Sequence, residues 1–280
     1  MPEFPRTMVE DLSLPRMLIG TNWFLGFSHQ SPSRDKLISD RSVSQIADVL
    51  AVFLEHGIDA IVGFIANDRM YEAVQDAQQR TGRKMIIIST PGIDVNESPE
   101  ADAKNAEIFD LEAKRGSSLV MPHTSSTDTM LDKRARVIRG MDKICAMIRE
   151  RDMIPGLSTH EPESIVFADE TKLDVGTYIS IYNAAGFMMP IEIDWVNHII
   201  RNAKNPVITI KPFAAGRLHP FVGLAFSWAT LRPQDMITVG TMTPDEAKEL
   251  IEISYSLFEN RQANVELQVT RSKQTLVKQD

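Results

Sequence analysis

Short apolar or β-branched runs recur along the chain, and each is followed by a stretch with helical spacing. Clear examples are Leu119-Val-Met-Pro-His123, Ile154-Pro-Gly-Leu-Ser-Thr-His160, Val207-Ile-Thr-Ile-Lys-Pro212 and Met236-Ile-Thr-Val-Gly240. This alternation predicts an α/β protein, a (β/α)8 TIM barrel. The expected strands are Met17 to Thr21, Ile58 to Gly63, Met85 to Ser89, Leu119 to Met121, Ile154 to Ser158, Tyr178 to Tyr182, Val207 to Ile210 and Met236 to Val239.

Two of the expected helices are well specified. The segment from Lys133 to Arg151 carries one apolar stripe, made of Val137, Ile138, Met141, Ile144, Cys145 and Ile148, which predicts a helix packed against the barrel. The last helix begins at Thr243, which can cap it, while Pro244 suits the first helical position and Glu246 can close a capping box.

The pattern indicates a single barrel domain over residues 1–258, with residues 1–15 as a lead-in at the barrel floor. Residues 259–280 form a polar C-terminal extension with one alternating stretch, Val265-Glu-Leu-Gln-Val269. That stretch could cover the barrel floor, pair with a partner subunit in a homo-oligomer, or belong to a partly ordered tail.

The amino-acid composition limits the classes of partner that we expect. The 280 residues carry 30 Lys and Arg against 38 Asp and Glu, a net charge of −8, so a nucleic-acid partner is not expected. The sequence contains no run of about 18 apolar residues, so no membrane span is predicted. The single Cys145 forbids an internal disulfide framework, and the N-terminus lacks the pattern of a signal peptide, so we expect a cytoplasmic protein with a small-molecule substrate.

Polar residues at the strand ends predict a functional site, because the C-terminal ends of barrel strands line one mouth. His123 and His160 end the fourth and fifth strands, and Lys211 ends the seventh. These groups suit a sugar-like or hydroxycarbonyl substrate, with a histidine as acid or base and Lys211 or Asn183 polarising an oxygen. The remaining candidates for substrate binding are Asn22, Trp23 and His29 after the first strand, and Tyr182 and Asn183 at the sixth. Lys211 could instead pair with a carboxylate in the mouth.

Four segments resemble the aldo-keto reductase superfamily. Gly156-Leu-Ser-Thr-His160 resembles its Gly-Val-Ser-Asn segment, and Tyr178-Ile-Ser-Ile-Tyr-Asn183 resembles the following strand. Ile210-Lys-Pro-Phe-Ala-Ala-Gly216 is similar to the Met-Lys-Pro-Leu-Ala-Gly-Gly segment of one branch, and Thr238-Val-Gly-Thr-Met-Thr-Pro-Asp-Glu246 resembles the strand and helix on its cofactor side. The resemblance runs roughly from Pro15 to Leu257 and implies an NAD(P)-linked oxidoreductase.

The resemblance also implies a catalytic tetrad, of which only the histidine is retained, as His123. The family's aspartate corresponds to Val62, its tyrosine falls near Asn67, and its lysine corresponds to Pro91. The nearest tyrosine, Tyr71, lies inside the next helical pattern. Without a cationic neighbour, a tyrosine with a pKa near 10 is a poor acid at neutral pH, so the expected chemistry is altered or lost.

The resemblance implies an NADP or NAD site with partly altered contacts. Ser158 matches a residue that contacts the nicotinamide carboxamide, while Thr159 and Ile179 replace its usual Asn and Gln neighbours. An aromatic residue that stacks on the nicotinamide corresponds to Ile210. Gly240, Thr241 and Thr243 form the loop on the cofactor side; this loop lacks the usual Arg or Lys for a 2′-phosphate, although Lys248 lies one turn away.

Three other functions remain open from the residues. His29, His123 and His160 with Asp128 or Glu192 could bind a metal, but no tight ligand spacing supports this and no metal is predicted. Lys211 could form a Schiff base if burial lowers its pKa, which with the metal site makes a non-redox lyase, isomerase or hydrolase the alternative. A non-catalytic ligand-binding barrel is the third.

Overall fold

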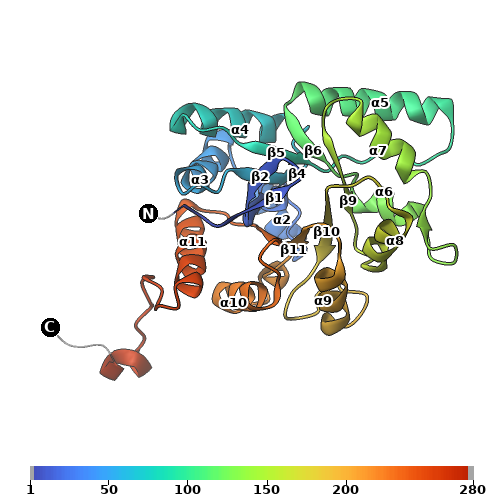
Figure 1. Ribbon diagram of the computed structural model, residues 1–280. Coiled ribbons are helices and arrows are strands. Elements are labelled where there is room, and N and C mark those ends of the chain that lie inside the picture. The colour runs from blue at the N-terminus through green and yellow to red at the C-terminus, as the bar shows by residue number, and fades with distance from the viewer. Residues whose placement is uncertain (1–2, 277–280) are drawn as a thin grey trace.

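The computed structural model describes residues 3–276 and has a closed barrel of eight parallel strands at its centre (Figure 1). Around the barrel the strands run in the order β3, β4, β5, β6, β9, β10, β11 and β12. The (β/α)8 barrel expected from the sequence is therefore confirmed. The strands are β3 (Met17–Gly20), β4 (Ala60–Gly63), β5 (Ile86–Ser89), β6 (Ser117–Val120), β9 (Ile154–Ser158), β10 (Thr177–Ile181), β11 (Val207–Ile210) and β12 (Met236–Val239).

Helices follow the strands and form the outer layer (Figure 1). The α-helices are α1 (Asn22–Leu25), α2 (Pro32–Ser39), α3 (Val43–Glu55), α4 (Asp68–Thr81), α5 (Pro99–Lys114), α6 (Thr124–Thr127), α7 (Met141–Arg149), α8 (Glu163–Thr171), α9 (Ile193–Asn202), α10 (Pro220–Thr230) and α11 (Pro244–Phe258). Three short 3-10 helices are η1 (Asp128–Met130), η2 (Ala214–Gly216) and η3 (Arg271–Leu276).

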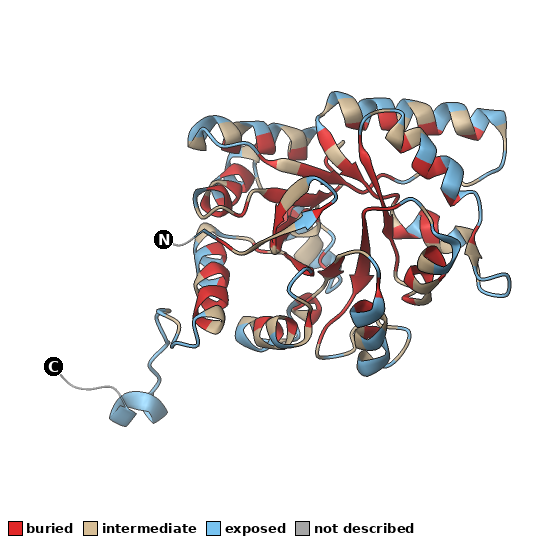
Figure 2. Ribbon diagram, viewed as in Figure 1, coloured by how far each residue is buried: buried red, intermediate tan, exposed pale blue. Residues whose placement is uncertain are grey.

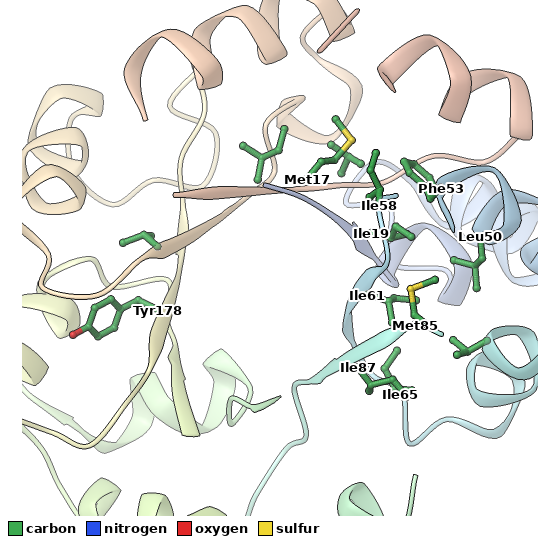
Figure 3. Close-up of a cluster of buried hydrophobic side chains, with 14 of the residues drawn as sticks. Met17, Ile19, Leu50, Phe53, Ile58, Ile61, Ile65, Met85, Ile87 and Tyr178 are labelled. Atoms are coloured by element: carbon green, nitrogen blue, oxygen red, sulfur yellow. The ribbon is translucent and has the colours of Figure 1, made fainter. Parts of the chain in front are cut away.

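The layer between strands and helices is apolar. The helices turn buried residues toward the barrel and exposed residues away from it (Figure 2). In the cluster between α3 and the first barrel strands, Leu50 and Phe53 lie beside Ile19 and Ile61 (Figure 3). The buried residues of α3, such as Ile46, Leu50 and Phe53, recur at helical spacing. Burial of this apolar face therefore holds the helix on the sheet.

A second apolar cluster fills the barrel interior and includes alternate strand residues such as Leu18, Val62 and Met236. The antiparallel hairpin of β1 (Arg6–Val9) and β2 (Leu12–Pro15) contributes Val9 and Leu14 to the same cluster. The hairpin lies at the N-terminal strand ends, because Val9 contacts the position of Gly176 just before β10. The opposite end, at the C-terminal strand ends, is the mouth.

The expected helix from Lys133 to Arg151 is wrong in its first half. Residues 131–138 form a hairpin of β7 (Leu131–Asp132) and β8 (Val137–Ile138), and α7 begins only at Met141. The turn is fixed because the Asp132 carboxylate accepts hydrogen bonds from two turn amides and Arg136 has a φ of 58°. The apolar stripe continues through both elements, which is why the pattern predicted one helix; its second half, including Cys145, is buried on α7.

The end of the chain follows the prediction in part. The Thr243 side chain accepts a hydrogen bond from the Glu246 amide and caps α11, whereas the Glu246 carboxylate accepts from Met242 instead of closing the box on Thr243. Beyond α11 the chain extends away from the barrel (Figure 1), and Leu267 and Val269 are exposed. Within residues 3–276, no helix has both the length and the apolar character needed to span a membrane.

Candidate functional site

Lys211 occupies the C-terminal end of β11, where the backbone departs from ordinary geometry. Its φ is 63°, and Ala214 and Ala215 in the following loop have φ values of 48° and 55°. Non-glycine residues in this region each cost about 1–3 kcal/mol, and such positions cluster at functional sites. Because Lys211 also precedes a proline, which disfavours helical geometry, the loop conformation must be held by its surroundings.

The Lys211 amine is largely buried and has no hydrogen-bond or ion-pair partner among the described residues. Burial lowers its pKa to about 8. The possibility that Lys211 simply pairs with a carboxylate is therefore wrong for this structure. Keeping an ammonium group without a counterion in a site largely shielded from water raises the free energy of the folded state. This lysine therefore does not serve to stabilise the fold.

Three histidines share the electrostatic environment of Lys211. Burial lowers the pKa of His160 to about 4, with the Lys211 charge as the second cause. The pKa values of His123 and of His29 are lowered by the same two causes, in the same order. Residues from the segments after four strands, β3, β6, β9 and β11, thus share one electrostatic environment. At neutral pH the histidines are neutral while Lys211 supplies the positive charge.

The charge of Asp128 acts on both His123 and His160, but its oxygens are already occupied. Oδ1 accepts from the Thr159 hydroxyl at 2.6 Å, and Oδ2 accepts from the Thr124 hydroxyl at 2.6 Å and from the His160 amide at 3.1 Å. Asp128 therefore ties the loop after β6 to the loop after β9. Its charge opposes the lowering of the histidine pKa values without pairing with Lys211.

The tautomer of His123 follows from its neighbours. The Ser125 amide donates to His123 Nδ1 at 3.2 Å, and the Ser125 hydroxyl lies 2.8 Å from the same nitrogen. A nitrogen that accepts from a backbone N–H carries no proton, so the neutral ring holds its proton on Nε2. The Phe64 ring packs against the imidazole, with centroids 5.0 Å apart. His123 is thereby oriented with a free donor at Nε2.

A cavity of about 470 Å³ adjoins His123 through Phe64, which contacts the imidazole and also lines the cavity. Its walls are mainly apolar and include Phe27 and Leu111. Asn67 and Pro91, the positions at which the family resemblance expects tyrosine and lysine, both line this cavity. The volume is in the range of small-molecule sites. Two of the tetrad positions thus border open space, and Phe64 lies between that space and the retained histidine.

The other tetrad positions contain no replacement acid. Val62 points into the apolar barrel interior, and Asn67 caps α4 by accepting from the Met70 amide. Tyr71 lies on α4 with its ring under the Arg115 guanidinium, 4.7 Å from the ring centroid. That contact joins Tyr71 to the C-terminal end of α5.

Two of the predicted substrate-binding residues are not turned toward the mouth. The Tyr182 hydroxyl accepts from Asn197 on α9, and its ring packs against Phe226 on α10, because Tyr182 falls on the outward face of its strand. Asn183 is buried and binds its own loop, accepting from the Phe187 amide and donating to the Phe187 carbonyl. Asn22 opens α1 beside the mouth.

The residues expected to contact a dinucleotide differ in whether their polar groups are already bonded within the protein. Thr159 is fully buried and bonded to Asp128. The Thr241 hydroxyl donates to the Thr243 carbonyl, and Thr243 is used as the cap of α11. Trp23 packs directly on Gly240, where a Cβ atom would lie 2.6 Å from the indole Cδ1. Ser158 is the member of this set that shares the inward face of β9 with Ile154.

Two buried polar residues near the site were missed at the sequence level. Thr238 lies two residues after Met236 on the inward face of β12, and its hydroxyl has no hydrogen-bond partner. Glu112 lines the cavity and accepts from Ser89 and Ser117, while burial raises its pKa. Its position on the buried face of α5, three residues after Phe109, was the available signal.

The proposed metal set is not assembled: among residues 3–276, no three or more His, Cys, Asp or Glu side chains are grouped as metal ligands. Cys145 is buried in the α7 stripe, where burial raises its thiol pKa to about 12. Such a thiol stays protonated and is not a nucleophile at neutral pH. The chemistry of the mouth therefore rests on Lys211 and the histidines.

Comparison with known proteins supports the fold. No protein-family model and no curated protein sequence matches the chain. Among solved structures, a protein assigned as an aldo-keto reductase from Pseudomonas aeruginosa is 17% identical, with a TM-score of 0.67 over 92% of this chain and 98% of that one. An aldo-keto reductase in complex with NADPH is 12% identical, with a TM-score of 0.57 over 93% and 89%.

The BexX/CysO complex of Amycolatopsis orientalis contains a chain that is 12% identical, with a TM-score of 0.54 over 95% of this chain and all of that chain. At these identities the comparisons show the barrel fold that this chain shares with aldo-keto reductases. The reaction must be argued from the site.

Proposed function

We propose that this protein is an NAD(P)-linked oxidoreductase that reduces a small carbonyl or sugar-like compound, with Lys211 as proton donor and His123 as the group that orients the carbonyl. The observation that carries the proposal is the unpaired, buried Lys211 amine beside His123 at the mouth. The apolar cavity next to His123 is the space for the substrate.

Lys211 can replace the missing tyrosine as an acid. Reduction of a carbonyl places negative charge on its oxygen, and a proton donor works best when its pKa is near the working pH. With a pKa of about 8, roughly nine tenths of the amine is protonated at pH 7. A tyrosine with an ordinary pKa near 10 needs an auxiliary cation to reach this range, whereas Lys211 reaches it through burial alone. The absence of the family's aspartate and lysine is then compatible with catalysis.

His123 complements that role as a neutral donor. The Ser125 contacts leave the Nε2 proton available, so the imidazole can donate to the carbonyl oxygen and hold it toward Lys211. Because the pKa of His123 is lowered, the ring does not compete with Lys211 as the charged group. His160 and His29 add further donors to the same mouth.

A nicotinamide dinucleotide fits the inward face of the barrel top in part. The Thr238 hydroxyl is a buried group without a partner, and Ser158 shares the barrel interior with it. These are suitable partners for a carboxamide, whereas Thr159 is engaged with Asp128. When bound, the cofactor would supply the hydride. The chain's own residues then bind the substrate, orient its carbonyl and supply the proton.

A second candidate is imine formation at Lys211, which would make the protein a non-redox lyase or isomerase. It is favoured by the same lack of a counterion, because about one tenth of the amine is neutral at pH 7 for a pKa of about 8. The neutral nitrogen adds to a carbonyl carbon, a carbinolamine forms, and water leaves with a proton from a neighbouring group. A ligand-binding barrel without catalysis would need neither property of Lys211.

The test is oxidation of NADPH and NADH with a panel of small aldehydes, ketones and hydroxycarbonyl sugars. Wild type should reduce some of these, and Lys211→Met should lose most of kcat while His123→Gln retains part of it. Lys84→Met, at an exposed surface lysine, is the matched control. Incubation of the same carbonyls with borohydride separates the candidates: a covalent adduct on wild type that is lost in Lys211→Met, without NADPH-dependent turnover, would replace the reductase by the imine enzyme.

A further inference from the structure

Two arginines near the mouth carry buried N–H groups without partners. Arg34 Nε and Arg41 Nη1 are shielded from solvent and make no hydrogen bond within the described chain. Guanidinium groups are strong donors with several N–H bonds to satisfy, and leaving a buried donor unpaired costs about 1–3 kcal/mol. Unpaired donors of this kind indicate a partner that is present when the protein functions.

Arg34 is placed by Trp23. Its guanidinium lies over the indole, 5.5 Å from the ring centroid, and Trp23 also packs on Gly240, just after β12. An arginine stacked on an aromatic ring keeps its N–H edge free for a ligand. Arg34 therefore borders the loop between β12 and α11.

Arg41 reaches the same loop from the start of α3. Burial lowers the pKa of Arg41; the nearby Glu246 charge opposes this, and the Arg69 charge adds to it. Arg69 itself donates to the Arg41 carbonyl. Glu246 is held by the Met242 amide at 2.6 Å, so it belongs to the loop and forms no ion pair with Arg41. Arg41 and Arg69 therefore lie close together near Glu246, and Arg41 Nη1 has no hydrogen-bond partner.

We propose that Arg34 and Arg41 form a binding site for the phosphoryl group of a ligand that extends past Trp23 toward Lys211. Arginine presents two parallel donors that match phosphate oxygens. Trp23 offers an aromatic surface between the phosphoryl end of the ligand and the end that approaches Lys211. The extension toward Lys211 rests on the proposed function, whereas the phosphoryl site does not. The phosphoryl group could belong to a dinucleotide or to a sugar phosphate.

Lys248, expected one turn into α11, is not part of this site. Its amine lies 3.5 Å from Asp245 on the exposed side of the helix. The first turn of α11 also carries Asp245 and Glu246, which disfavour an anion at the helix end itself. The cations proposed to bind a phosphoryl group at this loop therefore come from α2 and from the turn between α2 and α3.

The test is calorimetric titration with pyrophosphate, ADP, 2′,5′-ADP and glucose 6-phosphate. Wild type should bind pyrophosphate, and Arg34→Gln and Arg41→Gln should each weaken it by about tenfold or more, as expected for a charge-assisted hydrogen bond. Arg134→Gln, at an exposed arginine of the β7–β8 turn, is the control and should leave the affinity unchanged. Binding should weaken with salt.

The four ligands distinguish the sources of the phosphoryl group. Tighter binding of the adenosine diphosphates than of glucose 6-phosphate assigns the site to a dinucleotide, and the reverse order assigns it to a sugar phosphate. Equal binding by wild type and both variants, or no binding of any of the four by wild type, would overturn the inference. Pyrophosphate binding without NADPH-dependent turnover would keep this site and remove only the proposed reductase.

Discussion

Replacing Lys211 with methionine should make the protein more stable at neutral pH while it impairs the site. Burial holds the pKa of Lys211 at about 8, against 10.5 for an ordinary lysine. Each unit of pKa corresponds to about 1.4 kcal/mol, so the folded state is disfavoured by about 3 kcal/mol when both the folded and the unfolded chain carry the charge. Methionine has a similar length and no charge, and it removes this penalty.

The direction of the Lys211 pKa shift determines how the stability of the protein changes with pH. The unfolded chain binds the Lys211 proton more tightly than the folded chain, so the stability of wild type rises with pH between about 8 and 10.5. Below pH 8 the penalty is complete, and above 10.5 it is absent because both states are neutral. Lys211→Met lacks this titration. Its gain in unfolding free energy over wild type should be greatest at pH 7 and vanish at high pH.

Urea unfolding followed by tryptophan fluorescence at pH 7, 8.5 and 10 measures the effect. The variant should gain up to about 3 kcal/mol at pH 7, on the order of 6 °C in Tm for a domain of this size. Lys84→Met, at an exposed position, should change stability by less than about 0.5 kcal/mol at each pH. If Lys211→Met is less stable than wild type at pH 7, or if its advantage does not decrease with pH, the buried unpaired amine is refuted.

Two further substitutions test the architecture that supports the mouth, and a third tests the cavity beside it. Gly63→Ala places a Cβ atom 2.0 Å from Thr21 Oγ1 at a φ of 141° and should destabilise by about 3 kcal/mol or more in the same unfolding assay; a neutral effect would contradict the β3–β4 contact. Asp235→Ala removes a fully buried carboxylate that pairs with Arg232 and accepts from the Val207 amide, and a loss of about 3–5 kcal/mol is expected by urea unfolding. Glu112→Gln should stabilise at pH 7 and not at pH 4, because burial raises the pKa of Glu112 and its ionised form disfavours the folded state; equal effects at both pH values would argue against a buried carboxyl.

Much of the barrel could be predicted from the sequence because its signal is local. Each strand is a short apolar run, and the expected strands differ from the observed ones by no more than two residues at either end. The Lys133 to Arg151 stripe misled for a physical reason. Ile138 is buried and Val137 half-buried from a hairpin, and the break before α7 depends on Arg136 and Gly140 having positive φ. Apolar spacing does not report backbone dihedrals.

The site could be predicted only as far as strand ends determine it. His123, His160 and Lys211 share the mouth because parallel strands end together, and this followed from their positions. Tyr182 could not be assigned, because one residue of strand register decides whether a side chain faces inward or toward α9. The partner of Thr159, Asp128, and the neighbours of Arg41, Arg69 and Glu246, come from distant segments. Such contacts leave no periodic trace in the sequence.

Titration of the purified protein with NADPH and NADP⁺ tests the central claim most directly. Trp23, on α1, packs on Gly240 of the loop expected to bind the cofactor, so its fluorescence should change on binding. Saturable quenching in the micromolar range, weakened by Arg41→Gln and unchanged by Arg134→Gln, is the predicted result. No binding of either cofactor up to millimolar concentration would contradict the oxidoreductase.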